Sequence, residues 1–505
     1  MTGLLLLCGC STVIPDNVKA DENTTDTYNL SFSSEELDGS YEINGSTYIS
    51  LGNENVTIAK GGTYILEGTM ENAGIIVAVD DSEDVQLVLN SVTIHSGDFA
   101  GIYIVSGDEI LITLAEGSVN TISDSGTYTQ IDSNNVDALI YSKSDLAISG
   151  TGTLNLESSY NHGIVSKDDL IIAGGTYNIS VAGQGLSGKD CLMIYDGSFN
   201  ISCGKDALKS DNSEDEDRGY ITIIDGDFMI SSGADGIYAY RCISIEGGTF
   251  DITTVKSANA DSYKAIKSDN LITISGGEIT IDSADDSIHS DNEILISGGT
   301  ISIESDDDGI HADGKVQIDG GNITISAHEG IEATYVLINN GIINISASDD
   351  GINAAQKVKT YTATIEINGG YVTIVMGQGD TDGLDSNGYI YINGGTVDVS
   401  GMNTFDAEIA QEFNGGTVIV NGVEVDELPE DMMSGGFGGF PGFNGEKSGE
   451  NNNGTPPGFN GEKPSEGSDG FAQPGFNGGK EGGFEQLPPD FPDDEERHGH
   501  FPGGH

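Results

Sequence analysis

The sequence has no tryptophan and few basic residues. Its 505 residues include 82 Asp and Glu but only 19 Lys and Arg, which gives a formal net charge of -63. A surface of this charge repels nucleic acid and anionic lipid, so roles in binding such polyanions are excluded unless cations bridge the two. The absence of tryptophan excludes a binding surface built from indole rings. The excess of carboxylates instead favours binding of hard cations.

Cysteine is also scarce, and no apolar run is long enough to span a membrane. Five cysteines, widely scattered, are too few for a disulfide framework. A short apolar run at residues 4–7 precedes Cys8-Gly9-Cys10, which resembles the lipobox of bacterial lipoproteins with Cys10 as the lipidated residue. We therefore predict a truncated lipoprotein signal segment over residues 1–10 and a polar tether over 11–40. This places the protein outside the cell, on the bacterial surface, with membrane contact only through the lipid anchor.

The sequence does contain a repeat of 21–22 residues. Between residues 264 and 353, units begin at Lys264, Asp286, Asp308, Glu329 and Asp350, in steps of 22, 22, 21 and 21 residues. Each unit holds three short runs of alternating Ile or Val and polar residues, separated by Gly-Gly and Asp-Gly breaks. Alternation is typical of strands, and the breaks are typical of turns. The pattern predicts an all-β solenoid, a single-stranded parallel β-helix with about three strands per coil and coils about 4.8 Å apart.

The repeat predicts a β-helix domain over residues 41–425. The strands from 41 to 126 are longer and less regular, as expected of an N-terminal cap that closes an open sheet edge. Insertions lengthen some coils, at 213–218, 255–263, 355–363 and 377–381, and such loops commonly carry binding specificity. After residue 433 the chain becomes rich in Gly, Pro and Phe, and we predict a disordered tail over 426–505.

The strand that opens each coil carries polar side chains in columns. In the run DGIHAD, at 308–313, alternation turns the His and the last Asp outward. Stacking the coils gives two outward columns: one contains Lys209, Tyr238, Lys267, His289 and His311, and the other contains Asp211, Tyr240, Asp269, Asp291 and Asp313.

Stacked carboxylates repel one another unless cations neutralise them. Acidic turns just before the opening strands add a further carboxylate column, and calcium takes six to eight oxygen ligands of this kind. A solvated acidic face, with Asp present only for turn chemistry, is the alternative. We favour calcium, because Asn would also satisfy the turns. The predicted ligands are Asp211, Asp269, Asp286, Asp291, Asp307, Asp308, Asp313 and Asp350.

These features together resemble the clostridial carbohydrate-binding β-helix family, which is related to pectate lyases. The resemblance covers about residues 41–425 and rests on the DGIH-SD opening strands, the Gly-Gly turn before TISI, the irregular cap, the lipoprotein start and the Gly-Phe-Pro-rich tail. It implies a right-handed parallel β-helix that binds plant cell-wall polysaccharide, such as cellulose and polygalacturonate, with calcium on the helix.

The opening strands also supply candidates for carbohydrate contact. Tyr238 and Tyr240 both face outward on one coil, and paired exposed aromatic rings stack on sugar rings. We predict that these tyrosines, with Lys267, His289 and His311, contact the polysaccharide. Calcium bridging would let so negative a protein hold a polyuronate.

Two alternatives differ from simple binding. In a calcium-dependent lyase, a lysine removes the proton alpha to the uronate carboxylate, and Lys209 and Lys267 are the candidate bases. Because Lys-Ser-Asp recurs in two coils, salt bridges explain these lysines better than an active site, which occurs once. A structural adhesin or stalk would bind no glycan. We therefore favour a monomeric surface protein that binds polysaccharide without cleaving it.

Overall fold

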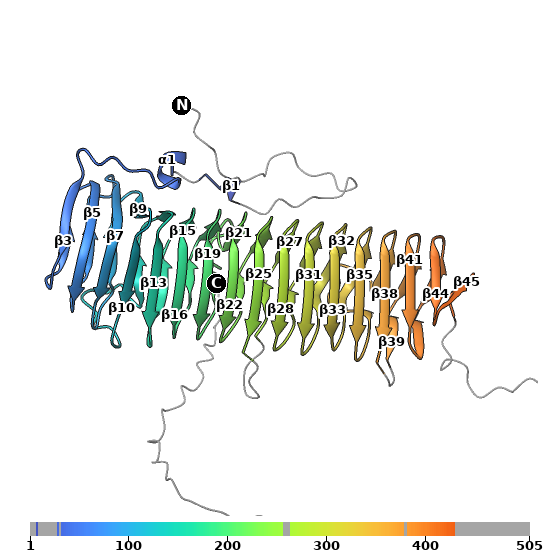
Figure 1. The fold of residues 1–505 in the computed structure, drawn as a ribbon. Coiled ribbons are helices and arrows are strands. Elements are labelled where there is room, and N and C mark those ends of the chain that lie inside the picture. The colour runs from blue at the N-terminus through green and yellow to red at the C-terminus, as the bar shows by residue number, and fades with distance from the viewer. Residues whose placement is uncertain (1–6, 9–27, 30–31, 256–262, 378–380, 430–505) are drawn as a thin grey trace, which may run out of the picture. The chain divides into compact units, whose positions relative to one another are not determined.

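The structure is a computed structural model that describes residues 7–8, 28–29, 32–255, 263–377 and 381–429. Its strands stack in chain order from β3 (Thr47–Leu51) to β45 (Val423–Val425), as Figure 1 shows. In the regular coils each strand pairs in parallel with the strand three positions later, so each coil contributes three strands. This confirms the predicted all-β parallel β-helix.

Three faces result from this stacking. The opening face consists of the first strand of each coil: β11 (Ala138–Ser142), β14 (His162–Ser166), β17 (Leu186–Gly188), β20 (Leu208–Ser210), β23 (Ile237–Ala239), β26 (Ile266–Ser268), β29 (Ile288–Ser290), the first parts of β32 (Ile310–Ile318) and β34 (Ile331–Ile338), β36 (Ile352–Ala354), β39 (Asp382–Ser386) and β42 (Asn403–Ala407).

The second face follows after a bend. It consists of β12 (Leu146–Gly150), β15 (Asp169–Ile172), β18 (Cys191–Ile194), β21 (Tyr220–Ile223), β24 (Cys242–Ile245), β27 (Leu271–Ile274), β30 (Glu293–Ile296), the last parts of β32 and β34, β37 (Thr364–Ile367), β40 (Tyr389–Ile392) and β43 (Ala410–Phe413).

The third face completes each coil. It consists of β13 (Thr153–Ser158), β16 (Thr176–Val181), β19 (Ser198–Cys203), β22 (Asp227–Ser232), β25 (Thr249–Thr254), β28 (Glu278–Ser283), β31 (Thr300–Ser305), β33 (Asn322–Ala327), β35 (Ile342–Ala347), β38 (Tyr371–Met376), β41 (Thr396–Ser400) and β44 (Thr417–Val420). The short β45 pairs with β44 in the antiparallel sense.

The first coils are irregular, as predicted for a cap. Their strands are β3, β4 (Val56–Ile58), β5 (Gly62–Glu71), β6 (Ile75–Ala78), β7 (Val85–His95), β8 (Ile102–Ser106), β9 (Ile110–Leu114) and β10 (Val119–Ser123). The long β7 pairs with both β9 and β10, so it serves the second and third faces at once. The register of β5 on β7 shifts between Leu66 and Gly68.

A segment just before the first coil packs against the second face. Helix α1 (Ser34–Leu37) begins at a capping box formed by Ser33 and Glu36. The side chains of Phe32 and Leu37 are buried against Ala147 and other apolar residues of the second face. Residues 32–40, expected as the end of the tether, thus belong to the folded domain. The part of the chain that the structure describes contains no helix long and apolar enough to cross a membrane.

Other predicted segments lie wholly or mostly outside the described residues. Short strands β1 (Leu7–Cys8) and β2 (Tyr28–Asn29) pair with each other. Cys10 and most of the segments predicted over 1–10 and 11–40 lie outside the described residues, and so does the predicted tail after residue 429.

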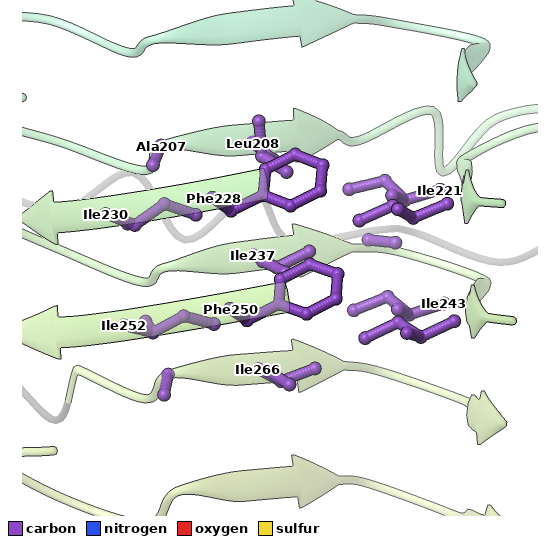
Figure 2. Packing of buried hydrophobic residues seen from close by; sticks show 14 of the residues in the cluster. Ala207, Leu208, Ile221, Phe228, Ile230, Ile237, Ile243, Phe250, Ile252 and Ile266 are labelled. Atoms are coloured by element: carbon purple, nitrogen blue, oxygen red, sulfur yellow. The ribbon is translucent and has the colours of Figure 1, made fainter. Parts of the chain in front are cut away.

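The core consists of aligned columns of apolar side chains. Tyr177, Phe199, Phe228 and Phe250 stack in successive coils, with ring centroids 4.6–4.9 Å apart and planes within 6° of parallel. Figure 2 shows Phe228 over Phe250, beside the isoleucine columns of the neighbouring strands. Alternation along each strand therefore predicted correctly which side chains face the core.

The turn before the third face requires its two glycines. Gly277 has φ +93°, and a Cβ on Gly276 would lie 2.3 Å from the Glu246 carbonyl oxygen. In the C-terminal coils an asparagine ladder precedes this turn. Each amide donates to the side chain of the previous coil at 2.7–2.9 Å, and the ladder runs from Asp319 through Asn339, Asn368, Asn393 and Asn414.

Candidate functional site

The first predicted column lies on the opening face in one continuous register. Parallel pairing aligns Lys209 with Tyr238, Tyr238 with Lys267, Lys267 with His289, and His289 with His311. The second column lies just beyond these strands, and its aspartates contact the first: Tyr238 donates to Asp269 at 3.3 Å, and His289 Nε2 lies 3.0 Å from Asp291 Oδ1. The structure thus brings the two columns together.

The acidic turns before the opening strands are partly structural. One carboxylate oxygen of Asp235 accepts the backbone N–H of Lys264 at 2.8 Å, one coil further on. Asp286 accepts in the same way from Asp308, and Asp350 accepts from Asp382. The turn column therefore ties neighbouring coils together and leaves the second carboxylate oxygen for other partners.

Asp286 is the most heavily paired of these turn carboxylates. It is 4% exposed, and its Oδ2 lies 3.3 Å from Lys264 Nζ, 2.8 Å from His289 Nδ1 and 3.3 Å from His311 Nδ1. Burial opposes ionisation, but hydrogen bonds from the two histidines and the charge of Lys264 lower the pKa of Asp286 well below its usual range. A metal ion at Asp286 would have to displace one of these partners.

His311 contacts both the carboxylates of the acidic turns and those further out on the opening face. Its Nδ1 lies 3.0 Å from Asp308 Oδ2, and its Nε2 lies 3.7 Å from Asp313 Oδ1 and 3.5 Å from Glu332 Oε2. Burial works against the charged ring, but hydrogen bonds to Asp286 and Asp308 raise the pKa of His311 to about 10. The carboxylates therefore favour the protonated ring, whereas the Lys357 ammonium, 3.0 Å from His311 Nε2, opposes it.

Lys209 and Tyr238 are held by their neighbours on this face. Lys209 Nζ lies 3.0 Å from Asp206 and 3.5 Å from Asp211. Burial disfavours its charge, but these carboxylates raise the pKa of Lys209 above its ordinary value. The ammonium groups of Lys209 and Lys267 lie 5.2 and 5.6 Å from the centroid of the Tyr238 ring. Lysine contacts thus occupy the ring that was predicted to stack on sugar.

The neighbouring tyrosine is also engaged. The Arg241 guanidinium lies 5.5 Å from the centroid of the Tyr240 ring. Tyr240 and Tyr238 are both partly exposed, so their edges remain accessible.

The carboxylates of the C-terminal coils are more crowded than those around Asp286. Glu329, Asp350 and Asp385 are each half-buried. Burial and the charge of Asp308 raise the pKa of Glu329 to about 8. Burial and the charges of Asp350 and Asp382 raise the pKa of Asp385 to about 7. These carboxyls therefore resist ionisation at this end of the opening face, and a bound cation would favour their charged forms.

The remaining predicted ligands differ in exposure. The side chains of Asp211, Asp291 and Asp313 are 46%, 52% and 43% exposed. Asp307 is also exposed, and oxygens of Asp307 and Asp308 lie within 4.8 Å of each other and of a His328 nitrogen. Burial and the charge of Asp291 raise the pKa of Asp269. Asp211, Asp291, Asp307 and Asp313 are therefore available to a ligand from solvent, whereas Asp308 is buried.

A loop from the next coil folds back over this region. Residues 355–363 connect β36 to β37, and Lys357 Nζ lies 2.6 Å from Glu332 Oε2. At the other end of the loop, Tyr361 donates to Glu293 Oε1 at 2.6 Å. The insertion therefore links the opening face to the second face.

Several residues that shape the site were not predicted as ligands or contacts. Lys264 and Glu329 begin units of the repeat, and Glu332 and Asp385 lie in the register of the first column, so the repeat located all four although none was named as a ligand or contact. Lys357 lies in an insertion without a register, and no periodic signal marks it.

Comparison with known proteins matches this chain to one family. The family model described as "Carbohydrate-binding domain-containing protein" matches residues 52–309 and 293–383. The chain belongs to this carbohydrate-binding family. The resemblance predicted from the repeat is confirmed, and polysaccharide is its expected class of partner.

Two relatives extend the comparison. A carbohydrate-binding domain-containing protein of Acetivibrio thermocellus is 33% identical over 231 residues, which cover 45% of this chain and 78% of the relative. A solved structure, the gadolinium derivative of the polysaccharide lyase-like protein from C. thermocellum, is 30% identical. It covers 42% of this chain and 90% of that chain with a TM-score of 0.40, and a score this low supports no structural inference.

Proposed function

We propose that the opening face of this carbohydrate-binding domain binds acidic plant cell-wall polysaccharide, such as polygalacturonate, through calcium. The observation that carries the proposal is the row of half-buried carboxyls at Glu329, Asp350 and Asp385 in successive coils, where burial and then the charges of neighbouring carboxylates raise their pKa values. A divalent ion relieves this repulsion and still has charge to attract a uronate carboxylate. The protein and a polyuronate, both negative, then associate through the ion.

The donor set fits a hard cation in this part of the face. Calcium prefers carboxylate and carbonyl oxygens, and successive coils supply carboxylates from Asp308, Glu329, Asp350 and Asp385. Asp286 has its own cationic partners, so we assign calcium to the C-terminal half of the predicted ligands. The outer aspartates Asp291 and Asp313 face solvent and would extend the same cation-binding column.

In this proposal the histidines and Lys267 lie beside the calcium ions and do not bind them. Calcium supplies the charge that attracts the uronate. His289 and His311 hold the turn aspartates Asp286 and Asp308 in place and offset part of their negative charge. Donors on the opening face, including Lys357, can then bind sugar hydroxyls. Tyr238 and Tyr240 contribute through their exposed edges.

A lyase reaction is less well supported. A lysine base must lose its proton, and the carboxylates beside Lys209 raise its pKa. Lys267 lies 5.6 Å from the centroid of the Tyr238 ring and belongs to the second copy of the Lys-Ser-Asp run. We therefore propose binding without cleavage.

The proposal is tested by titrating the full chain with polygalacturonate in calcium and in chelator. The variant Asp350→Asn/Asp385→Asn should lose most calcium-dependent binding, whereas Asp251→Asn, an exposed aspartate of the third face, should not. Binding that ignores chelator would overturn the calcium bridge. Unsaturated, ultraviolet-absorbing products would establish the lyase, and no binding to any glycan would favour a structural stalk.

We also propose that the protein is a monomer anchored to the outer bacterial surface by lipid on Cys10. The support is the sequence Leu7-Cys8-Gly9-Cys10. Cys10→Ser should abolish incorporation of labelled fatty acid in a bacterial host and release the protein into the medium. Retention of the label in this variant would overturn the assignment.

A further inference from the structure

Two histidines on the opening face direct a ring nitrogen toward the same carboxylate. The run Asp-x-x-His occurs at 286–289 and again at 308–311, so stacking places the two histidines side by side in β29 and β32. Their ring centroids lie 4.8 Å apart, with the planes tilted by 63°. Asp286 Oδ2 lies 2.8 Å from His289 Nδ1 and 3.3 Å from His311 Nδ1. The repeat therefore brings nitrogen and oxygen donors from two coils to one point.

A second carboxylate completes this group of donors. Asp308 Oδ2 lies 3.0 Å from His311 Nδ1. Ligand atoms of Asp286, His289 and His311 all lie within 4.8 Å of one another. In a tetrahedral site with zinc bond lengths of about 2.0–2.2 Å, neighbouring ligand atoms are about 3.3–3.6 Å apart. The donors are thus already close to the separations that such an ion requires.

Other contacts hold the first pair of donors in position. Asp286 Oδ1 accepts the backbone N–H of Asp308 at 3.2 Å, which leaves Oδ2 for a ligand. On the outer side of its ring, His289 Nε2 lies 3.0 Å from Asp291 Oδ1. Metal-binding histidines commonly donate their second ring N–H to a carboxylate in this way. The contact fixes the tautomer that presents Nδ1 to an ion.

The second histidine has carboxylates on its outer side as well. His311 Nε2 lies 3.5 Å from Glu332 Oε2 and 3.7 Å from Asp313 Oδ1. The Lys357 ammonium lies 3.0 Å from the same nitrogen and 2.6 Å from Glu332 Oε2. When Nδ1 binds a metal, Nε2 carries the ring proton. The ammonium then keeps Glu332 as its partner, and the ring donates to a carboxylate.

The charges of this group balance those of a divalent ion. Two carboxylates and two neutral imidazoles carry two negative charges, which one divalent cation neutralises. The two histidine side chains are each 13% exposed, and those of Asp286 and Asp308 are 5% and 9% exposed, so uncompensated charge there is costly. Lys264 is the partner of Asp286 that gives way to the ion, because its ammonium also contacts Asp285 at 3.1 Å.

The imidazole nitrogens indicate which metal fits. Calcium prefers oxygen ligands, whereas zinc and neighbouring transition metals bind imidazole and carboxylate together. The next members of the same column are Glu332, Asn353 and Asp385, which have no imidazole. Consecutive histidines therefore distinguish these two coils from the C-terminal coils to which calcium is assigned.

We propose that one zinc-type divalent ion binds in a closed tetrahedral site formed by His289, His311, Asp286 and Asp308. The ion replaces the protons that otherwise lie between the imidazoles and the carboxylates, and it joins β29 to β32 across two coils. Because the protein fills all four positions, the site is structural. It differs from the proposed calcium site in its metal and its histidines, and it does not depend on carbohydrate binding.

The test measures zinc binding to the full, metal-free chain by equilibrium dialysis in an excess of calcium. The native chain should bind one more zinc ion than His289→Gln/His311→Gln. His162→Gln is the matched control and should bind as much zinc as the native chain. This histidine also lies on the opening face, in β14, but its Nδ1 accepts the backbone N–H of Gln184 at 2.8 Å.

A second variant keeps all four ligands and guards against loss of the fold. Asp291→Asn changes a side chain that is 52% exposed, and it removes the carboxylate behind the His289 ring. It should weaken zinc binding by about 10–100-fold. Cobalt bound in place of zinc should give the strong visible absorption of a tetrahedral site in the native chain, and His289→Gln/His311→Gln should lose it.

The outcomes decide the proposal independently of the calcium site. All of the proteins carry Asn in place of the three histidines among residues 498–505, so that the end of the chain adds no zinc. Equal zinc binding by the native chain and the double histidine variant would overturn the proposal, and so would displacement of zinc by calcium. A weak, octahedral cobalt spectrum would overturn the closed site. None of these variants changes Asp350 or Asp385, so calcium-dependent polygalacturonate binding is tested separately.

Discussion

The ammonium of Lys264 lies 3.3 Å from Oδ2 of Asp286, and the two side chains are 8% and 5% exposed. Lys264 occupies the turn position that holds Asp206, Asp235, Asp286, Asp308, Glu329 and Asp350 in other coils. It also contacts Asp285 at 3.1 Å. One lysine therefore supplies positive charge inside a buried row of carboxylates, where the repeat would otherwise place another acid.

Replacing this lysine should destabilise the middle coils. Lys264→Met keeps the length of the side chain but leaves Asp285 and Asp286 without its charge, a change that costs about 3–5 kcal/mol for a buried pair. Chemical denaturation should show the loss, whereas Lys359→Met, at an exposed position, should have little effect. Adding Asp285→Asn to Lys264→Met, which removes the charge of the other carboxylate beside this lysine, should recover part of the stability. Equal stability of Lys264→Met and the native chain would contradict the structural role.

The stacked aromatic column makes a second prediction. Phe228→Ala removes a ring that lies 4.7 Å from Phe199 and 4.6 Å from Phe250, so it should cost about 3–5 kcal/mol. Met229→Ala is the control, because this neighbour faces outward and is 61% exposed. Hydrogen exchange should accelerate in the coils around residue 228 in the first variant. The same exchange pattern in both variants would contradict the contribution of the column.

Repeat length and alternation together predicted the fold and the alignment of the first column. In a stack with constant register, residues one period apart lie side by side, which is why Lys267, His289 and His311 were correctly aligned. Alternation likewise identified the inward face of each strand. Both inferences depend only on backbone geometry, which the sequence pattern reports directly.

The burial of the turn carboxylates could not be predicted in the same way. Alternation describes strands, and Asp286 and Asp308 lie at bends, where no period indicates whether a side chain points inward. The contact between Tyr361 and Glu293 joins residues 68 positions apart through an insertion with no register.

A third prediction concerns pH and the carboxylates at the bend into the second face. Burial, followed by the charges of Asp145 and Asp190, raises the pKa of Asp168 to about 7, against 3.8 for an ordinary Asp. At a pH between these two values, Asp168 therefore keeps its proton in the folded protein but has lost it in the unfolded chain. The resulting stabilisation is present at acidic pH and disappears as pH rises through about 7.

Asp168→Asn should remove this dependence. In chelator, its unfolding temperature should match that of the native chain near pH 5 and exceed it by about 1–3 °C above pH 8, measured by thermal unfolding. The reverse order, with the variant less stable at high pH, would show that the ionised carboxylate is needed by the fold.

A fourth prediction concerns calcium and stability. An ion that binds only the folded chain stabilises it by about 2.7 kcal/mol at a hundred times its dissociation constant. Calcium should therefore raise the unfolding temperature, and chelator should reverse the change. Asp350→Asn/Asp385→Asn should reduce the gain, while Asp251→Asn should keep it. An equal gain in both variants would place the ion elsewhere on the protein.

The antiparallel pairing of β45 with β44 has a consequence for assembly. Each coil pairs with the next through strands that run in the same direction. Without β45, the last third-face strand, β44, would have a free edge that could pair with the first coil of another copy. Because β45 runs the opposite way along that edge, an incoming parallel strand finds the position filled. The reversal therefore blocks end-to-end pairing with another copy along the third face of the last coil.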